Sequence, residues 1–223
     1  ATLPRGNALT DPTPEPTQRP GRHLVFVDKP ERTQTQILIG CLGSHPHDPD
    51  HIPLHVANTV FGGTFTSRLT QEVRGKRGWS YGAYASLRSF SMWPVPKADD
   101  ALACIQLELA LFEAWVREGI TQEELDWVKA YLVRSHAFAV DSSSKRVGQL
   151  LDMELYGLPD GYHTEYTQRV AAGTLSQANQ SLRRLTPKDL LISVVGSKEP
   201  IFDALKAGIP HLESSEVIPF DTD

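Results

Sequence analysis

Residues 61–84 read FGGTFTSRLTQEVRGKRGWSYGAY, and no other part of the chain gathers glycine, basic and aromatic residues so densely. Gly62 and Gly63 end one helical pattern, because glycine is the usual residue just past a helix C-terminus. A short helix is expected over 67–75, and a strand with alternating side chains is expected from Gly78 onward. The stretch therefore predicts a helix, a Gly-Gly turn, a short helix and a strand, in that order.

Outward from this stretch, strands and helices are grouped instead of alternating strictly. Apolar runs bounded by turn residues predict strands at 23–28, 34–43, 80–92, 190–195 and 217–220. Apolar residues at helical spacing, with capping residues before them, predict helices at 51–61, 67–75, 98–118, 121–140, 142–156, 161–171, 176–185 and 200–207. This grouping favours an α+β fold in which helices cover a mainly antiparallel sheet.

The first 21 residues differ in composition from the rest of the chain. They contain five prolines mixed with threonine, glycine and charged residues, a composition that buries little surface and tends to be extended. We expect residues 1–21 to be a Pro-rich interdomain linker with a further unit attached upstream. Residues 22–223 are expected to form a single domain.

The overall composition excludes several classes of function. The chain has 22 Lys+Arg against 27 Asp+Glu, a net charge of −5, and no long basic run. This argues against nucleic acid as the main partner, because binding phosphates requires a concentrated positive face. It has no apolar run near the ~20 residues that cross a bilayer. Cys41 and Cys104 are expected to be buried as small apolar side chains, since two distant cysteines make neither a disulfide scaffold nor a zinc site.

The 8 histidines predict no metal site. His51 and His55 share a helix face, but the glutamate of the zinc-peptidase patterns H-E-x-x-H and H-x-x-E-H is missing. We expect a plain surface pair; an independent enzyme with a metal on these two histidines is the alternative. The chain also lacks G-x-S-x-G and a phosphate-binding glycine loop, so it holds no self-sufficient catalytic set.

Arg74 and Tyr81 are the best candidates for a binding role. Arg74 lies at the end of the short helix and Tyr81 at the start of the next strand, with glycines tightening the turn between them. Their guanidinium and phenol groups can converge on one spot and hold a peptide carbonyl or a developing oxyanion. The alternative from spacing alone is an exposed arginine and a tyrosine packed on the sheet.

The same stretch resembles the C-terminal, non-catalytic domain of the pitrilysin/insulinase zinc peptidases (inverzincins), which include mitochondrial processing peptidase. The matching residues are Gly62-Gly63, Ser67-Arg68-Leu69, Val73-Arg74, Gly78 and Tyr81. Weaker similarity extends over about 22–221: Val27-Asp28-Lys29-Pro30 and Gln34-Thr35-Gln36 resemble opening strands, Gly119–Leu125 a helix–turn–helix, and Val195-Gly196 a final strand.

The resemblance implies a processing-peptidase/LuxS-like metallohydrolase fold and a peptidase of two or four such domains closing around a chamber. One domain bears the H-x-x-E-H zinc motif, and the facing domain contributes an Arg/Tyr pair that grips the substrate backbone; Arg74 and Tyr81 match that pair. This chain has no H-x-x-E-H. The resemblance therefore places zinc and the general base in a partner domain or subunit. Family members with similar linkers suggest a bacterial exported or periplasmic protein.

Two functions follow from this resemblance. In the first, the chain is the substrate-binding, zinc-less half of a zinc metalloendopeptidase, with peptides as substrates, a zinc-bearing homologous domain or subunit as partner, and no catalysis alone. In the second, it is an inert scaffold or assembly subunit of the same fold. Retention of both Arg74 and Tyr81 favours the first, because a scaffold needs neither.

Overall fold

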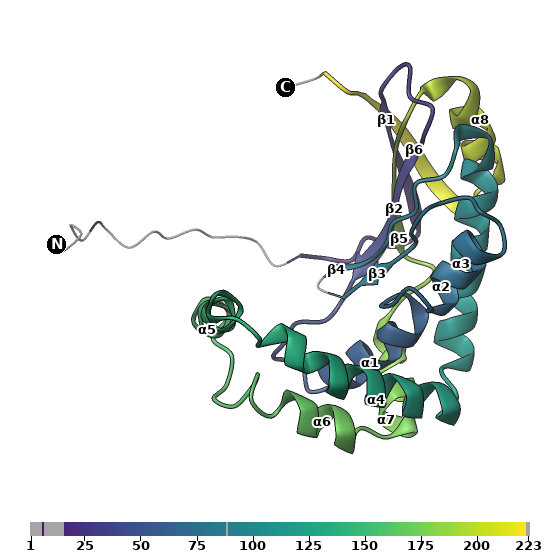
Figure 1. Ribbon diagram of the computed structural model, residues 1–223. Coiled ribbons are helices and arrows are strands. Elements are labelled where there is room, and N and C mark those ends of the chain that lie inside the picture. Colours follow the sequence, from purple (N-terminus) through teal and green to yellow (C-terminus); the bar gives the residue numbers. More distant parts are fainter. Residues whose placement is uncertain (1–5, 7–15, 88, 222–223) are drawn as a thin grey trace.

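Six strands form one sheet in the order β3-β4-β2-β5-β1-β6 (Figure 1). The computed structural model describes Gly6, residues 16–87 and residues 89–221. The strands are β1 Arg22–Asp28, β2 Gln36–Leu42, β3 Ala85–Ser86, β4 Ser89–Met92, β5 Leu190–Gly196 and β6 Leu212–Pro219. The β3–β4, β4–β2 and β2–β5 pairs are antiparallel, and the β5–β1 and β1–β6 pairs are parallel. The expected α+β class with a mainly antiparallel sheet is confirmed.

The described part of the chain also contains eight α-helices. They are α1 His51–Phe61, α2 Arg68–Thr70, α3 Ala101–Glu118, α4 Gln122–Ala139, α5 Ser143–Tyr156, α6 Tyr166–Ala172, α7 Leu175–Ser181 and α8 Lys198–Gly208. A π-helical turn at Gln71–Gly75 continues α2, and 3-10 turns lie at Ala98–Asp100 and Leu182–Arg184. The expected helices are all present, with shifted ends.

One face of the sheet is buried and the other is open. Along β2, Ile37 and Ile39 are fully buried, whereas Leu38 and Leu42, which point the other way, are exposed. This alternation is what a period of two residues dictates for a strand. Helices α3 and α8 lie on the buried side, and neither lies on the open side (Figure 1).

Aromatic side chains fill the core between α1, α3 and β4. The ring of Phe61 stacks on Trp115 with centroids 4.4 Å apart, and the ring of Phe90 stacks on Phe112 at 4.5 Å. All four are essentially buried, and such rings contribute most of a core's apolar area. Cys41 and Cys104 are buried as expected.

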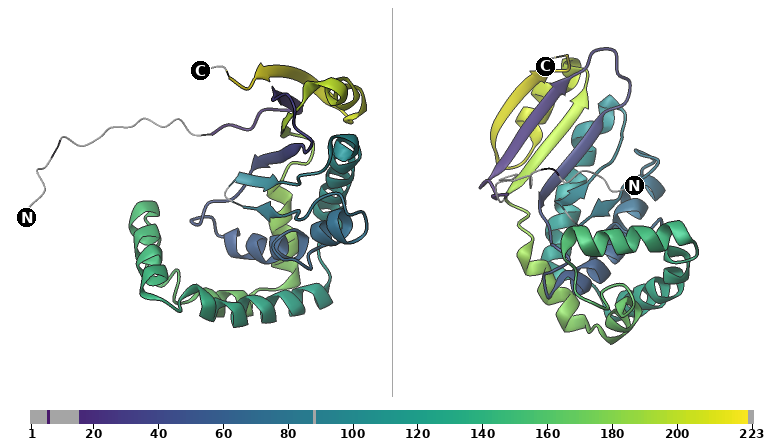
Figure 2. Two further views of the ribbon diagram at one scale, coloured as in Figure 1. Left: turned by 45° about the horizontal axis from the view of Figure 1, so that its top comes forward. Right: turned by 90° about the vertical axis from the view of Figure 1, so that its left-hand side faces the viewer.

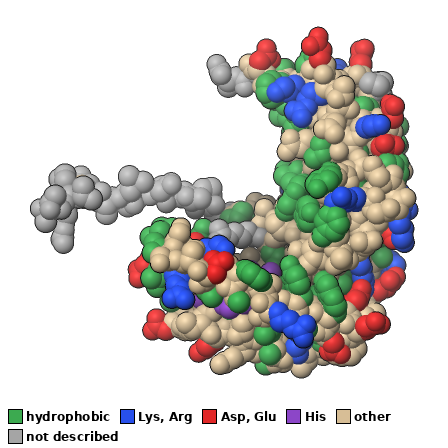
Figure 3. All heavy atoms as spheres, viewed as in Figure 1, with side chains coloured by type: hydrophobic (Ala, Val, Ile, Leu, Met, Phe, Trp, Pro, Cys, Tyr) green, Lys and Arg blue, Asp and Glu red, His purple; other side chains and the backbone are tan. Residues whose placement is uncertain are grey.

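Helices α4 to α7 form an arm that extends away from the sheet (Figure 1). α4, α6 and α7 pack against α1, and α5 stands apart at the end of the arm, across from the open sheet face (Figures 1 and 2). In the space-filling view the surface is hollowed between α5 and the sheet, with hydrophobic side chains on the sheet wall and histidine near the floor (Figure 3). We call this concave surface the hollow.

Three details differ from the sequence expectation. The strand expected over 80–92 is a hairpin of two short strands, β3 and β4, because the chain turns at Leu87 and β3 pairs antiparallel with β4. The short helix over 67–75 widens into a π-helical turn. The last strand begins at Leu212 instead of 217, because it pairs with β1 along that strand's whole length.

The expected linker, residues 1–21, lies mostly outside the described residues, and the division into linker and domain stays a prediction. Its described end is fixed to the sheet by Gln18, whose side-chain amide donates to the Asp189 carbonyl and accepts from the Leu42 amide, both at 2.8 Å. Among the described residues, no helix combines the length and apolar character needed to cross a membrane.

Candidate functional site

The stretch 61–84 is held in a compact fold by close backbone contacts. A Cβ on Gly62 would lie 2.6 Å from the Cβ of Ala85, so only glycine permits this approach. The Ala85 amide donates to the Gly62 carbonyl at 2.9 Å, and the Thr70 hydroxyl donates to the Ala83 carbonyl at 2.7 Å. These bonds fix the short helix against the start of β3.

A tight turn brings Tyr81 next to Arg74. Gly78 has a φ of +65°, the left-handed region in which glycine is favoured. Its amide donates to the Arg74 carbonyl at 2.9 Å, and the Trp79 amide donates to the Val73 carbonyl at 3.1 Å. The chain therefore reverses within four residues of Arg74.

The Arg74 guanidinium lies against two aromatic rings. Its central carbon is 4.2 Å from the ring centroid of Phe65 and 4.2 Å from that of Tyr81. The structure thus brings the two predicted residues together, through the face of the tyrosine ring. Phe65 completes the group, which we call the Arg74 sandwich (Phe65, Arg74 and Tyr81). Sequence reasoning missed Phe65; an aromatic residue in the turn after Gly62-Gly63 is the only signal it offered.

Arg74 differs from the other basic residues of the stretch. The Arg68 guanidinium makes a two-pronged contact with Glu124, at 2.7 and 2.6 Å, and Lys76 and Arg77 both pair with Glu72. Arg74 has no such carboxylate partner among the described residues, and its Nη1 is shielded from solvent without a hydrogen-bond acceptor. A guanidinium stacked on rings keeps its plane fixed and its N–H donors at the edge.

The paired carboxylates show the electrostatic effect of these contacts. Hydrogen bonds from Lys76 and Arg77 lower the pKa of Glu72. Burial alone would raise the pKa of Glu124, but its bonds with Arg68 and with the Thr121 backbone lower it overall. Both acids stay ionised: Glu124 offsets the charge of Arg68, and Glu72 shares its single charge between Lys76 and Arg77. The Arg74 sandwich therefore holds a positive charge that no carboxylate in the described chain offsets.

His51 and His55 lie away from this sandwich, beside a cavity of about 650 Å³ at the floor of the hollow. The His51 ring nitrogen lies 2.8 Å from the Ser44 hydroxyl, and His55 Nε2 lies 3.0 Å from the Tyr166 hydroxyl. Burial lowers the pKa of His51, and it lowers the pKa of His55 to about 4. The expected surface pair is wrong, because α4 and α6 cover this side of α1.

These histidines do not form a metal centre. Within the described ranges, no three His, Cys, Asp or Glu side chains are grouped so that they could hold a metal ion. Among the residues that the structure places, His51 and His55 therefore lack the third ligand that a zinc site requires. The alternative of a metal enzyme built on this pair therefore finds no geometry to support it.

A family model described as the peptidase M16 inactive domain matches residues 1–132 of this chain. The crystal structure of a peptidase M16 inactive domain from Pseudomonas fluorescens is 29% identical to it, with a TM-score of 0.77. That alignment covers 87% of this chain and 48% of the other.

Some curated relatives are named as proteases, and one is named as a non-peptidase homolog. An uncharacterized zinc protease of Streptomyces coelicolor is 29% identical over 168 residues, which cover 72% of this chain and 34% of the relative. A non-peptidase homolog from Helicobacter pylori is 23% identical over 205 residues, covering 88% of this chain and 47% of the relative. The chain spans less than half the length of these relatives.

Proposed function

Because this chain belongs to the peptidase M16 inactive-domain family, we propose that it is the substrate-binding half of a zinc metalloendopeptidase. As the non-catalytic half, it leaves the zinc to a partner domain. Peptide hydrolysis then requires both halves, with this chain supplying contacts to the peptide and the partner supplying metal and general base.

The observation that supports this proposal is the Arg74 sandwich. Its guanidinium has no carboxylate partner among the described residues, whereas Arg68, Lys76 and Arg77 close by are all paired. The shielded and unpaired Nη1 donor costs free energy in the free chain. Contact with a peptide oxygen would remove that cost, so the sandwich is suited to a carbonyl or carboxylate ligand.

The two rings determine how Arg74 acts. Stacking on Phe65 and Tyr81 holds the guanidinium plane, so little rotamer freedom is lost when its donors engage an acceptor. Tyr81 is 85% exposed, so its hydroxyl is available to a ligand that approaches the same edge. A fixed cation and a hydroxyl donor stabilise negative charge that develops on a carbonyl oxygen as a tetrahedral intermediate forms.

The test is turnover by the intact protein, with its zinc-bearing half, after Arg74→Ala. Loss of a donor to a developing oxyanion typically lowers kcat by roughly 100-fold to 1,000-fold, and we expect a loss of that order. Arg77→Ala is the matched control, because that arginine lies three residues away and pairs with Glu72. Zinc content and the melting temperature should stay unchanged in both variants.

Two further variants separate the roles of the rings. Tyr81→Phe keeps the stacked ring and removes only the hydroxyl, so a fall in kcat would assign the hydroxyl to the transition state. Phe65→Leu removes the other ring and should mainly raise KM, because the guanidinium is then less well held. Unchanged turnover in both Arg74→Ala and Tyr81→Phe would overturn the proposal.

An inert scaffold is the second candidate, favoured by one finding. The Helicobacter pylori relative, which aligns with 88% of this chain, is named a non-peptidase homolog. In a scaffold of this fold, Arg74 and Tyr81 would have no kinetic role. The Arg74→Ala experiment therefore separates the two functions.

A further inference from the structure

Helix α5 turns its apolar side chains away from the rest of the chain. Val147, Leu150, Leu151 and Leu155 recur at the spacing of one helix face, and all four are more than half exposed. We call this set the α5 stripe. The opposite face carries the half-buried Gln149, Asp152, Met153 and Tyr156.

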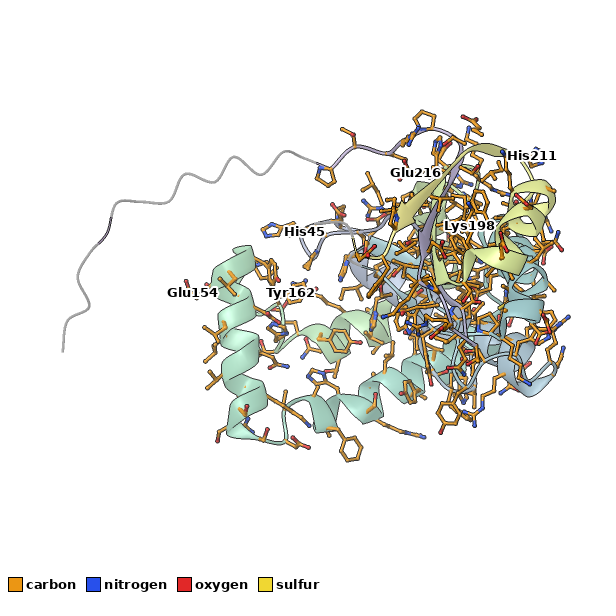
Figure 4. All side chains as sticks on the ribbon, turned by 90° about the horizontal axis from the view of Figure 1, so that it is seen from above. His45, Glu154, Tyr162, Lys198, His211 and Glu216 are labelled. Atoms are coloured by element: carbon orange, nitrogen blue, oxygen red, sulfur yellow. The ribbon has the colours of Figure 1, made fainter. Side chains whose placement is uncertain are left out.

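The side-chain view shows this orientation directly. Glu154, which helical spacing places on the same face as the α5 stripe, points away from the molecule, whereas Tyr162 lies on the inner side, between α5 and the rest of the chain (Figure 4). No residue of α5 is buried. A surface helix normally buries its apolar face and exposes its polar face, so α5 has the reverse arrangement.

Contacts at both ends hold α5 in this position. At its start, the Lys145 ammonium donates to the Phe138 carbonyl at 2.6 Å, and the Arg146 Nε donates to the Val140 carbonyl at 3.1 Å. At its end, His47 Nε2 lies 2.6 Å from the Tyr156 carbonyl oxygen. The stripe is therefore presented on a fixed arm, and an exposed apolar surface of this kind marks an interaction site.

We propose that the α5 stripe is the docking surface for the zinc-bearing domain, and that this domain is joined to the chain through the Pro-rich segment. The identity of this partner rests on the proposed function. The described N-terminal end of the chain points to this partner: Pro16 and Tyr156, the last residue of α5, line the same cavity of about 320 Å³. Pro16 therefore lies near the end of α5.

The length of the tether fits this arrangement. Fifteen residues precede Pro16, and such a segment spans at most about 50 Å when extended. An upstream domain on this tether has a high effective concentration near the stripe. The relatives are more than twice as long as the part that this chain matches, which leaves room for a second domain of similar size.

The chemistry of the stripe also favours a domain over a peptide substrate. A helix face offers no unpaired backbone groups, so it recognises complementary side chains and not peptide backbone. A substrate of varied sequence would not present a constant apolar surface, whereas a domain of the same chain would. A second copy of this chain is the other folded partner with a constant surface, and the experiment separates it.

The test is photocrosslinking in the intact protein, purified with all its domains or subunits. A benzoylphenylalanine replaces Leu151 on the stripe, and in a control sample it replaces Gln149 on the inner face. Equal amounts of ¹⁵N-labelled and unlabelled protein are mixed before irradiation, so that peptides from two copies are recognised by their mixed mass. We expect position 151 to crosslink to the domain that contains H-x-x-E-H, and position 149 to crosslink within residues 16–223.

A crosslink from position 151 to a second copy, to an added peptide or to this chain itself would overturn the proposal, and so would no crosslink. The result is independent of Arg74: docking without an effect of Arg74→Ala would leave a scaffold that binds its partner through α5.

As a second readout, Leu150→Glu with Leu151→Glu should keep the melting temperature of this chain and lower turnover of the intact enzyme at least tenfold. The matched control is Val133→Glu on α4, which should leave turnover unchanged.

Discussion

Helices α3 and α5 are both amphipathic in sequence, yet their apolar faces have opposite environments. In α3, Ile105, Leu109 and Phe112 are essentially buried against the sheet and α1. In α5, Leu150 and Leu155 recur at the same kind of spacing and are 62% and 75% exposed. The difference shows that spacing predicts an apolar face, but not which surface covers it.

Position in the fold accounts for this difference. α3 follows directly from the β3–β4 hairpin and lies along the buried side of the sheet, where its apolar face meets the strands. α5 follows α4 at the far end of the arm, where the described chain offers no element to cover it (Figures 1 and 2). The apolar face of α5 therefore stays exposed in the described chain.

Among substitutions in these two helices, the largest loss in the free energy of unfolding is expected in α3. Phe112→Ala removes a fully buried ring that stacks on Phe90, and we expect a loss of about 3–5 kcal/mol in the free energy of unfolding. Chemical denaturation of residues 1–223 measures this loss. A change below about 1 kcal/mol would show that the α3 face is not packed as described.

The second effect is a pH dependence of stability that comes from Glu108, a polar residue on the otherwise apolar buried face of α3. Its carboxylate is fully buried without a hydrogen-bond partner among the described residues, and burial raises its pKa to about 8. The unfolded chain ionises this group near its ordinary pKa of 4.5, so stability falls by about 1.4 kcal/mol per pH unit between 4.5 and 8.

Glu108→Gln tests this dependence, because the amide keeps the shape and cannot ionise. The variant should match the parent near pH 4 and become more stable than the parent as the pH rises, with the difference levelling off above pH 8. Melting temperatures measured from pH 4 to pH 9 check this. Parallel curves for the two proteins would mean that Glu108 is ionised in the fold.

The smallest effect is expected in α5. Leu155→Gln replaces a side chain that is 75% exposed, so the free energy of unfolding of this chain should change by no more than about 0.5 kcal/mol. The same denaturation experiment measures it. A loss above about 1.5 kcal/mol would contradict the account, since it would mean that this chain itself covers the α5 stripe.

Local sequence signals predicted most of the elements. Thr121 and Glu124 form the expected capping box at the start of α4, and Gly119 and Gly157 end α3 and α5 as expected. Periodicity could not predict the parallel pairing of β1 with β5 and β6, because pairing partners depend on how distant segments assemble. The turn at Leu87 was missed because the buried positions shift there, from Ala83, Ala85 and Leu87 to Phe90 and Met92, and a period of two does not predict such a shift.

The candidate site was predicted only in part. The seven-residue spacing, with Gly75 and Gly78 in the turn between them, predicted that Arg74 and Tyr81 meet, and they do. Phe65 was missed because no short-range pattern says that a turn residue stacks on a distant guanidinium. The burial of His55 was missed for a similar reason, since α6 covers it from more than a hundred residues away in sequence.

The central claim is that this chain is the zinc-less half of a peptidase that another domain completes. Native mass spectrometry of the protein purified from its source, with zinc determination, tests it most directly. We predict an H-x-x-E-H domain, carrying one zinc, either upstream in the same polypeptide or in a stoichiometric partner. A native protein with neither such a domain nor such a partner would contradict the peptidase account and leave the scaffold function.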